Sequence, residues 1–162
     1  MLLFGAKYLY LIIIAMAVIF YGLQPRERRK NILVLSIIYL PLAYLFGQIA
    51  AHFYFDARPF VVGHFQPLIP HAANNGFPSD HMLFSSAIAS IVFIYNKKIG
   101  VLAWVIAHFV GYSRVSSGLH HWIDVFGSAL VAIAVMVLVD RYIVPYIAKM
   151  KTLQRFFNYK SV

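Results

Sequence analysis

Long apolar segments separated by short polar ones constrain this sequence more than any other feature. A helix needs roughly 20 apolar residues, within a range of about 17–25, to cross a lipid bilayer. Runs of this kind occupy approximately residues 2–23, 32–55, 78–95, 99–112 and 122–146. The 162 residues are 62% hydrophobic and only 12% charged, and this length suits one domain. The sequence therefore predicts an all-α, polytopic membrane bundle of about five helices, with a single domain over residues 1–162.

The polar segments between these runs predict the loops and the helix starts. Residues 56–80 and 113–124 are rich in polar residues, glycine and histidine, so we expect structured loops there. Pro78 suits a first helical position, and residues 96–98 read as a tight turn. The first run is too long for a signal-peptide core and precedes its basic cluster, so we expect an uncleaved helix.

The distribution of positive charge predicts the orientation in the membrane. The net charge is +9, and most basic residues lie in residues 24–31, in residues 96–98 and in the tail from residue 141 onward. Five spans would place these regions on one side, which the positive-inside rule makes cytoplasmic. The loops at 56–80 and 113–124 would then share the outer face. We attribute the charge to topology and anionic lipid rather than to nucleic acid.

Several ionisable residues gather near this predicted outer face. They are Arg58, Asp80, His81, Arg114, His120, His121 and Asp124. Ionisable groups at membrane depth are costly, so they indicate a functional site by default. The absence of cysteine excludes thiolate nucleophiles and cysteine-based zinc sites.

His120 and Asp124 are four positions apart, which would place them on one face of a helix. A carboxylate bonded to one imidazole nitrogen fixes the tautomer and leaves the other nitrogen as a nucleophile or base. The alternative reading is a zinc-binding pair, which the nearby arginines oppose because they would repel a dication. Arg58 and Arg114 offer planar forks of donors that suit phosphate oxygens, and His81 suits a general acid. The expected helix start near Pro78 would add free N–H groups for an anion.

Three motifs in order resemble those of the type-2 phosphatidic acid phosphatase superfamily. Residues 113–124 read Ser-Arg, five residues, His, three residues, Asp, which is similar to the third motif. Residues 77–81 read Phe-Pro-Ser-Asp-His, similar to the second motif, and Arg58-Pro59 resembles the end of the first. The resemblance implies the core fold of acid phosphatases and vanadium haloperoxidases. The second motif usually has Gly at the position of Asp80. With Asp there, the Phe-Pro-Ser-Asp-His run resembles the bacitracin-resistance branch of the superfamily, which comprises bacterial undecaprenyl-diphosphate phosphatases.

This resemblance implies a reaction and a role for each motif residue. His120 would attack the terminal phosphorus and form a phosphohistidine, Asp124 would orient it, and His81 would protonate the departing lipid phosphate. Arg58, Ser79 and Arg114 would hold the phosphoryl oxygens. We add Asp80 and His71 to the expected phosphate-binding set, His71 because it lies six residues before Phe77 in the same loop. No metal or cofactor is expected. The substrate would be a lipid diphosphate. Its hydrolysis on the extracytoplasmic face of the bacterial inner membrane would recycle the lipid carrier of cell-wall synthesis. A lateral opening between helices would admit its prenyl tail.

The sequence departs from the family's first motif at one position, and other substrates and one other class of protein remain as alternatives. The first motif usually has Lys seven residues before its Arg, but position 51 is Ala, with Gln48 and His52 as partial substitutes. The rival substrates are phosphatidic acid, phosphatidylglycerophosphate and lipid A, and the rival class is a non-catalytic lipid-phosphate binder or transporter.

Two nearby residues have open alternatives, and two others are read as turn residues. His121 is read as lining the mouth of the pocket or as an interfacial residue, and Asp56 as a partner of Arg58 or as a solvated carboxylate. Asn74 and Asn75 are read as turn residues.

Overall fold

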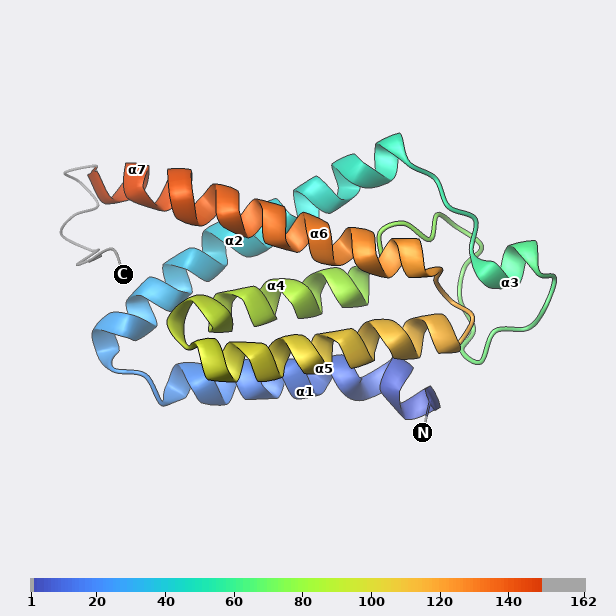
Figure 1. Cartoon of the computed structure of the whole chain (residues 1–162), viewed down its shortest axis with the longest axis horizontal. Helices are drawn as coiled ribbons and strands as arrows, with labels where there is room; N and C mark the ends of the chain where they lie inside the picture. The colour runs from blue at the N-terminus through green and yellow to red at the C-terminus, as the bar shows by residue number, and fades with distance from the viewer. Residues whose placement is uncertain (1, 150–162) are drawn as a thin grey trace.

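A computed structural model describes residues 2–149 of the chain, and all its regular elements are helical (Figure 1). Within these residues the only extended pairing is an isolated antiparallel bridge between Ala57 and Asn75. The elements in chain order are α1 (Leu2–Gly22), α2 (Arg26–Phe53), α3 (Pro59–Val62), α4 (Asp80–Tyr95), α5 (Lys97–Ser116), α6 (Trp122–Leu138), the π-helical segment η1 (Val139–Ile143) and α7 (Val144–Lys149).

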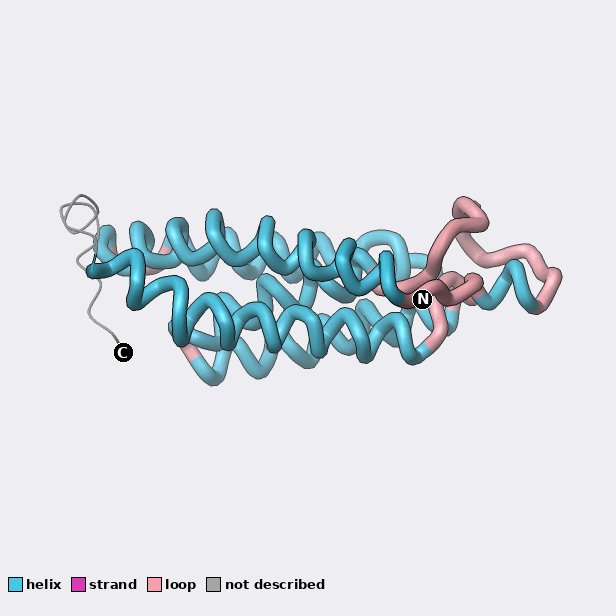
Figure 2. Tube along the Cα trace, turned by 90° about the horizontal axis from the view of Figure 1, so that it is seen from above, coloured by secondary structure: helices cyan, strands magenta, loops and turns pink. Residues whose placement is uncertain are grey.

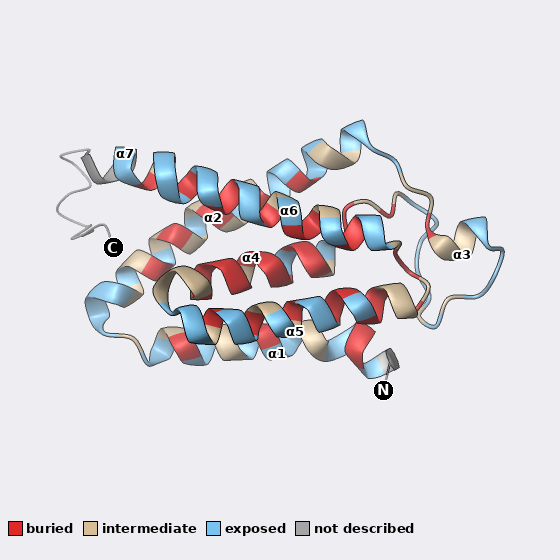
Figure 3. Cartoon of the chain, in the orientation of Figure 1, coloured by how far each residue is buried: buried red, intermediate tan, exposed pale blue. Residues whose placement is uncertain are grey.

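The central helix is α4, which packs against α1, α2, α5 and α6. Figure 3 shows that α4 is largely buried, whereas the outer helices expose apolar side chains on their outward faces. Among residues 2–149, four helical segments are long and apolar enough to cross a membrane, and α4, with 16 residues, is shorter. The predicted all-α membrane bundle of about five helices is confirmed, with α4 enclosed by the others.

Several predicted helix boundaries were wrong, and local capping explains some of the differences. Asn96 accepts a hydrogen bond through Oδ1 from the N–H of Ile99 at 3.1 Å, so α5 begins at Lys97 instead of following a tight turn at residues 96–98. Helix α2 begins at Arg26, directly after Pro25, so its basic cluster lies in the first turns of the helix.

The ends of α4 and α5 near the predicted loops also differ from expectation. Helix α4 begins at Asp80 with Ser79 as its N-cap, so Pro78 precedes the helix, and the Phe77–Pro78 peptide bond is cis. Helix α5 continues to Ser116, so Arg114 lies in the last turn of a helix rather than in a loop. The last predicted span, residues 122–146, agrees with the candidate membrane span Trp122–Tyr146, within which α6 is followed by η1 and the start of α7.

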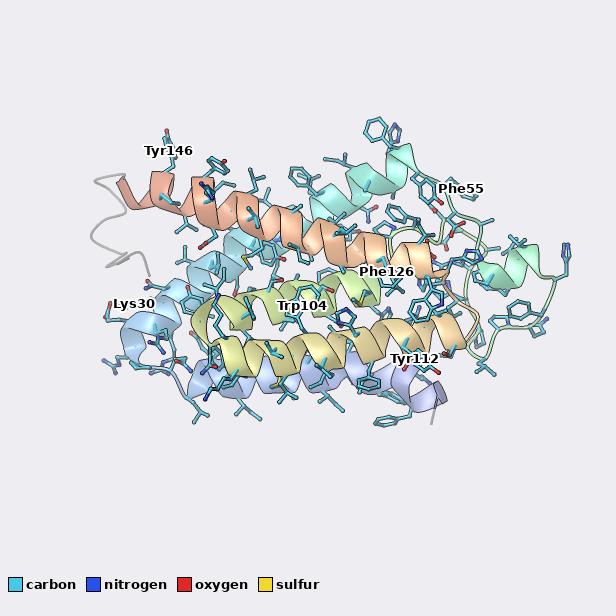
Figure 4. The ribbon with its side chains drawn as sticks, in the orientation of Figure 1. Lys30, Phe55, Trp104, Tyr112, Phe126 and Tyr146 are labelled. Carbon is cyan, nitrogen blue, oxygen red and sulfur yellow. The ribbon has the colours of Figure 1, made fainter. Side chains whose placement is uncertain are left out.

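The loops that carry the motif residues lie at one end of the bundle. Figure 2 shows the long loop around α3 at the same end as the N-terminus of the chain. The α1–α2 turn, the α4–α5 junction and α7 lie at the opposite end, where Lys30 is labelled far from Phe55 in Figure 4. Lys30 and Lys97 therefore share one end, as the charge pattern predicted, whereas the tail after residue 149 lies outside the described residues.

Candidate active site

Five polar residues from the three predicted motifs are buried at the loop end of the bundle. They are Arg58, Ser79, Arg114, His120 and Asp124, none with more than 5% of its surface exposed. Buried ionisable groups are expensive unless they are paired or serve a function. Their burial at one end of the helices makes this the candidate site.

His120 is held by hydrogen bonds on both ring nitrogens. Its Nδ1 lies 2.9 Å from the carbonyl oxygen of Gly76 and 3.3 Å from Oδ2 of Asp124. Both partners are acceptors, so Nδ1 carries the proton and Nε2 keeps its lone pair. Nε2 lies 3.2 Å from Nη1 of Arg58. The imidazole is therefore fixed in the tautomer that leaves Nε2 available as a nucleophile.

The predicted contact between His120 and Asp124 exists, but the prediction that both residues lie on one face of a helix was wrong. Helix α6 begins at Trp122, so His120 precedes the helix and shares no helical face with Asp124. Asp124 instead reaches back from the first turn of α6, and its Oδ2 also accepts a hydrogen bond from the backbone N–H of His121 at 2.9 Å. A fully buried carboxylate is thereby fixed beside the imidazole.

Arg58 is fixed by hydrogen bonds to residues from two other segments. Its Nε donates to Oδ1 of Asn74 at 2.9 Å, and its Nη2 donates to the carbonyl oxygen of Asn75 at 3.2 Å. Its Nη1 donates to the carbonyl oxygen of Leu119 at 2.9 Å. These acceptors orient the guanidinium beside Nε2 of His120 before any substrate arrives.

Asn75, read from the sequence as a turn residue, organises this corner of the site. Its side-chain oxygen accepts hydrogen bonds from the backbone N–H groups of Asp56 at 2.9 Å and Phe77 at 3.0 Å. Its side-chain nitrogen donates to the carbonyl oxygens of Ala51 at 3.1 Å and Tyr54 at 3.0 Å. One amide thus ties the end of α2 to the loop that carries Arg58. Sequence reasoning missed it, since an Asn-Asn-Gly run usually indicates a turn.

Arg114 lies buried in the last turn of α5, and its Nη1 donates to the carbonyl oxygen of Ala6 at 3.2 Å. Its Nε is buried with no hydrogen-bond partner in the described structure. Among the described residues, neither Arg114 nor Arg58 has a carboxylate oxygen within 4.0 Å. Since buried cations are normally paired, the two guanidinium groups form a site that suits an anion.

The start of α4 contributes Ser79, Asp80 and His81. Ser79 is fixed to α6, since its carbonyl oxygen accepts from Oγ of Ser128 at 3.0 Å, while its own Oγ is buried without a partner. The ring of His81 is perpendicular to that of Tyr10 on α1, with 4.9 Å between the ring centroids. The side chain of Asp80 is exposed at the mouth of the site.

His71 lies on the exposed loop and shares only an electrostatic environment with the other residues. Its Nδ1 lies 3.3 Å from the carbonyl oxygen of Ala72, and no hydrogen bond joins it to the other predicted site residues in the described part of the chain. Partial burial lowers the pKa of His71, and the charges of Arg58 and Arg114 lower it further. His71 thus lies within the field of both arginines without contacting them.

Burial and charge together keep His120 neutral at physiological pH. Burial lowers the pKa of His120, the arginines Arg58 and Arg114 lower it further, and Asp124 partly opposes the shift. Burial also lowers the pKa of Arg58, against the influence of Asp124 and Asp80. A guanidinium nonetheless stays protonated near pH 7. The site therefore combines two cations with a neutral imidazole.

A direct contact between Asp56 and His121 replaces both alternatives considered for Asp56. Nδ1 of His121 lies 2.7 Å from Oδ2 of Asp56, so Asp56 neither pairs with Arg58 nor stands free in solvent. Together with Asp124, these residues place possible metal-ligand atoms within 4.8 Å of one another. Oδ2 of Asp56 and Oδ2 of Asp124 already take part in hydrogen bonds with His121, and the positive charge of Arg58, which interacts with Asp124, disfavours a dication there.

The position usually occupied by Lys lies at the end of α2. Ala51 contributes its carbonyl oxygen to Asn75, and the candidate substitutes Gln48 and His52 are both exposed. The ring of His52 packs against that of Phe53, with centroids 5.4 Å apart. Neither substitute is among the buried groups of the site, so Arg58 and Arg114 are its buried cations in the described structure.

Comparisons with known proteins identify the family of this chain. Residues 32–146 match the PAP2 superfamily. The chain is 30% identical over 131 residues to the bacitracin transport permease protein BcrC of Bacillus licheniformis, covering 80% of this chain and 64% of that protein. It is 37% identical over 119 residues to the undecaprenyl-diphosphatase BcrC of Bacillus subtilis (strain 168), covering 72% and 60% respectively. The chain thus spans less than two thirds of the length of these relatives. No solved structure matches it.

Proposed function

This chain belongs to the PAP2 superfamily, and on that premise we propose that it is a membrane phosphatase acting on polyprenyl diphosphates. The substrate we favour is undecaprenyl diphosphate, which would be hydrolysed to the monophosphate and inorganic phosphate. The name of the Bacillus subtilis relative, an undecaprenyl-diphosphatase, supports this choice. The many apolar helices make a lipid substrate accessible from the bilayer.

The observation that carries the proposal is the pair of buried arginines beside a neutral histidine. Arg58 and Arg114 lack carboxylate partners within 4.0 Å in the described structure, so a bound phosphate would supply the missing negative charge. Fixed donors aimed at a phosphoryl group are the main source of catalysis in phosphoryl transfer. The buried hydroxyl of Ser79 and the first N–H groups of α4 add further donors.

The first chemical step forms a bond between His120 and phosphorus. Nε2 of His120 attacks the terminal phosphorus, and the bond from phosphorus to the bridging oxygen breaks. His81 gives its proton to that bridging oxygen, so the polyprenyl monophosphate leaves. The proton on Nδ1 of His120 stays between the Gly76 carbonyl and Asp124, which stabilises the positive charge that develops on the ring.

The second step returns the enzyme to its starting state. His81, now neutral, removes a proton from water, whose oxygen attacks the phosphorus of the phosphohistidine. The bond between phosphorus and Nε2 breaks, and inorganic phosphate is released. The arginines hold the phosphoryl oxygens through both steps, so every charge in the cycle is balanced by side chains of this chain.

We place the reaction on the outer face of the cytoplasmic membrane of a bacterium, where it would regenerate the carrier of cell-wall precursors. Support comes from the charge distribution, because Lys30 and Lys97 lie at the opposite end from Arg58 and His120. Phosphatidic acid, phosphatidylglycerophosphate and lipid A phosphates are the alternative substrates for the same arrangement.

Phosphate release from purified protein tests the proposal. Polyprenyl diphosphate, phosphatidic acid and phosphatidylglycerophosphate are offered in turn, each with and without EDTA. We expect fastest release from the diphosphate and the same rate with EDTA. Tight binding of the lipids without release, in several detergents, would instead favour a non-catalytic lipid-phosphate binder or transporter.

The rate should depend on pH through His120. Nucleophilic attack requires the neutral ring, and burial lowers the pKa of His120 from its ordinary value of about 6.5. We therefore expect the acid limb of kcat/KM, which follows protonation of His120, to be centred below pH 6.5, whereas loss of the proton that His81 donates lowers kcat/KM on the alkaline side of the maximum. The same shift makes the folded state less stable below about pH 6.5, because the unfolded chain takes up the proton more readily. An acid limb centred above pH 6.5, after correction for titration of the substrate by phosphorus NMR, would contradict this assignment.

Asn75→Asp should slow the reaction while leaving substrate binding largely intact. The substitution replaces the donor that faces the carbonyl oxygens of Ala51 and Tyr54 with a repelling oxygen, so Arg58 loses its support. Leaving buried polar groups unpaired costs about 1–3 kcal/mol, so Tm should also fall. We expect kcat to fall more than ten-fold and KM to change less than three-fold. The same change at Asn31, at the opposite end of the bundle, is the control, and equal losses in both variants would refute a positioning role.

A further inference from the structure

Two cavities lie end to end along α4, and the first of them starts at His81. The first, of about 340 Å³, is lined by α1 and α4 and has Asp80, His81 and Ser85 among its walls. The second, of about 240 Å³, continues between α1, α2 and α4 toward the other end of the bundle. Ile14 and Ile88 line both cavities, so the two are neighbours at these residues, and we refer to them together as the groove.

The groove changes from polar to apolar along its length. Its residues near the site include Asp80 and His81, whereas Phe84, Ile88, Ile91 and Val92 follow along α4. From residue 80 to residue 92 a helix rises about 18 Å, which gives the extent of the groove along α4. Figure 1 shows that α1 and α2 meet at their short turn and diverge toward the loop end of the bundle.

Helix α1 lies outside the segment that matches the PAP2 superfamily, yet it completes this end of the site. The carbonyl oxygen of Ala6 accepts the hydrogen bond from Arg114, and the ring of Tyr10 packs edge-on against His81. Gly5 packs so closely on Ser113 that a Cβ atom there would collide with its hydroxyl group. Contacts of this kind make α1 a wall of the site as well as a membrane anchor.

We infer that the groove between α1 and α4, continuing under α2, binds the isoprenoid chain of the substrate and that α1 thereby helps to select long-chain lipids. This inference rests on the proposed function, because the position of the chain follows from the reaction. The lipid is attached to the phosphate that leaves, and the leaving oxygen receives its proton from His81. The chain must therefore leave the site on the side that His81 faces, and His81 lines this groove.

A second apolar groove serves as the control for the groove that contains His81. It has a volume of about 410 Å³ and lies between α5 and α6, with Tyr112 and Phe126 among its walls, as labelled in Figure 4. Val105 also lines it, but none of the buried site residues does. Both grooves face lipid, so only the groove that contains His81 should respond to the length of the substrate chain.

Filling each groove tests the inference through substrate selectivity. Ile88→Trp and, separately, Ile14→Trp narrow the junction of the two cavities, and Val105→Trp narrows the α5–α6 groove. KM and kcat are measured for undecaprenyl diphosphate and for isopentenyl diphosphate, which has a single isoprene unit. We expect the ratio of the long-chain KM to the short-chain KM to rise at least ten-fold for Ile88→Trp or Ile14→Trp, and to stay within two-fold of wild type for Val105→Trp.

A binding measurement separates this inference from the proposed activity. The chain contains no cysteine, so Ile88→Cys and Val105→Cys each introduce a single thiol. In a His120→Ala background, where lipid is not consumed, we measure labelling by a membrane-permeable maleimide with and without each diphosphate. Undecaprenyl diphosphate should slow labelling at position 88 at least five-fold and change the labelling rate at position 105 by less than two-fold. Isopentenyl diphosphate should slow labelling at neither position.

The outcomes distinguish the two claims. Protection at position 88 by the long-chain lipid, together with no phosphate release from the protein that retains His120, would support the groove and overturn the proposed catalysis. Phosphate release without such protection, or with protection at position 105, would overturn the groove and leave the catalysis standing. Unchanged KM ratios in both Ile88→Trp and Ile14→Trp would also overturn it.

Discussion

His120→Ala is expected to reduce kcat for polyprenyl diphosphate by on the order of 10⁴-fold or more, because it removes the proposed nucleophile. No neighbouring group can replace Nε2: Asp124 lies on the opposite edge of the ring, and Arg58 is a cation. Binding should survive, since Arg58 and Arg114 remain. The KM should therefore change much less than kcat, and steady-state phosphate release measures both.

The adjacent histidine provides the control for this variant. His121 carries the same side chain one position later, but 41% of its side chain is exposed and it bonds to Asp56. His121→Ala should therefore keep activity within about ten-fold of wild type, in keeping with the small effect of most exposed positions. A His120→Ala protein that folds, as judged by Tm, and retains more than a tenth of the wild-type kcat would exclude His120 as the nucleophile.

The second large effect is expected at Arg58. Arg58→Ala removes a fixed donor beside the reacting nitrogen, and the loss of one such donor costs about 10²–10³-fold in kcat. The hydrogen bonds of Arg58 explain why lysine should fail to replace it. Arg58 uses all three of its nitrogens for bonds to Asn74, Asn75 and Leu119, and a lysine ammonium cannot reproduce that planar fork.

Arg58→Lys therefore separates charge from geometry. We expect it to recover less than ten-fold of the activity lost in Arg58→Ala, even though the positive charge is restored. Arg28→Ala serves as the control, because Arg28 is exposed at the opposite end and bonds only to Gln24 among the described residues. Full recovery by lysine would mean that charge alone matters, and it would remove the role given to Asn74 and Asn75.

Much of this site could be predicted from the sequence, because its key residues are ionisable groups in an apolar chain. Arg58, Arg114, His120 and Asp124 were identified on that basis, and the structure buries all four at one end. The helices were predictable for the same reason, since long apolar runs leave few alternatives in lipid. Their ends were less predictable, because a cap such as Asn96 depends on local backbone geometry.

The supporting contacts could not be predicted, because they join residues that are far apart in the sequence. The bond between His121 and Asp56 crosses 65 positions, and the one between His120 and the Gly76 carbonyl crosses 44. Backbone carbonyls also leave no trace in the residue type. Gly76 approaches Asp124 so closely that an added Cβ would lie 3.0 Å from its Oδ2, a constraint visible only in three dimensions.

Detection of a phosphohistidine tests the central claim most directly. Purified protein is mixed with polyprenyl diphosphate labelled on its terminal phosphate, quenched in alkali within the first turnover, digested and sequenced by mass spectrometry. Because a nitrogen–phosphorus bond survives alkali and breaks in acid, the account predicts an alkali-stable, acid-labile phosphate on the peptide that contains His120, absent from His120→Ala. Rapid phosphate release with no label on that peptide, or with the label on His81 or His71, would contradict it.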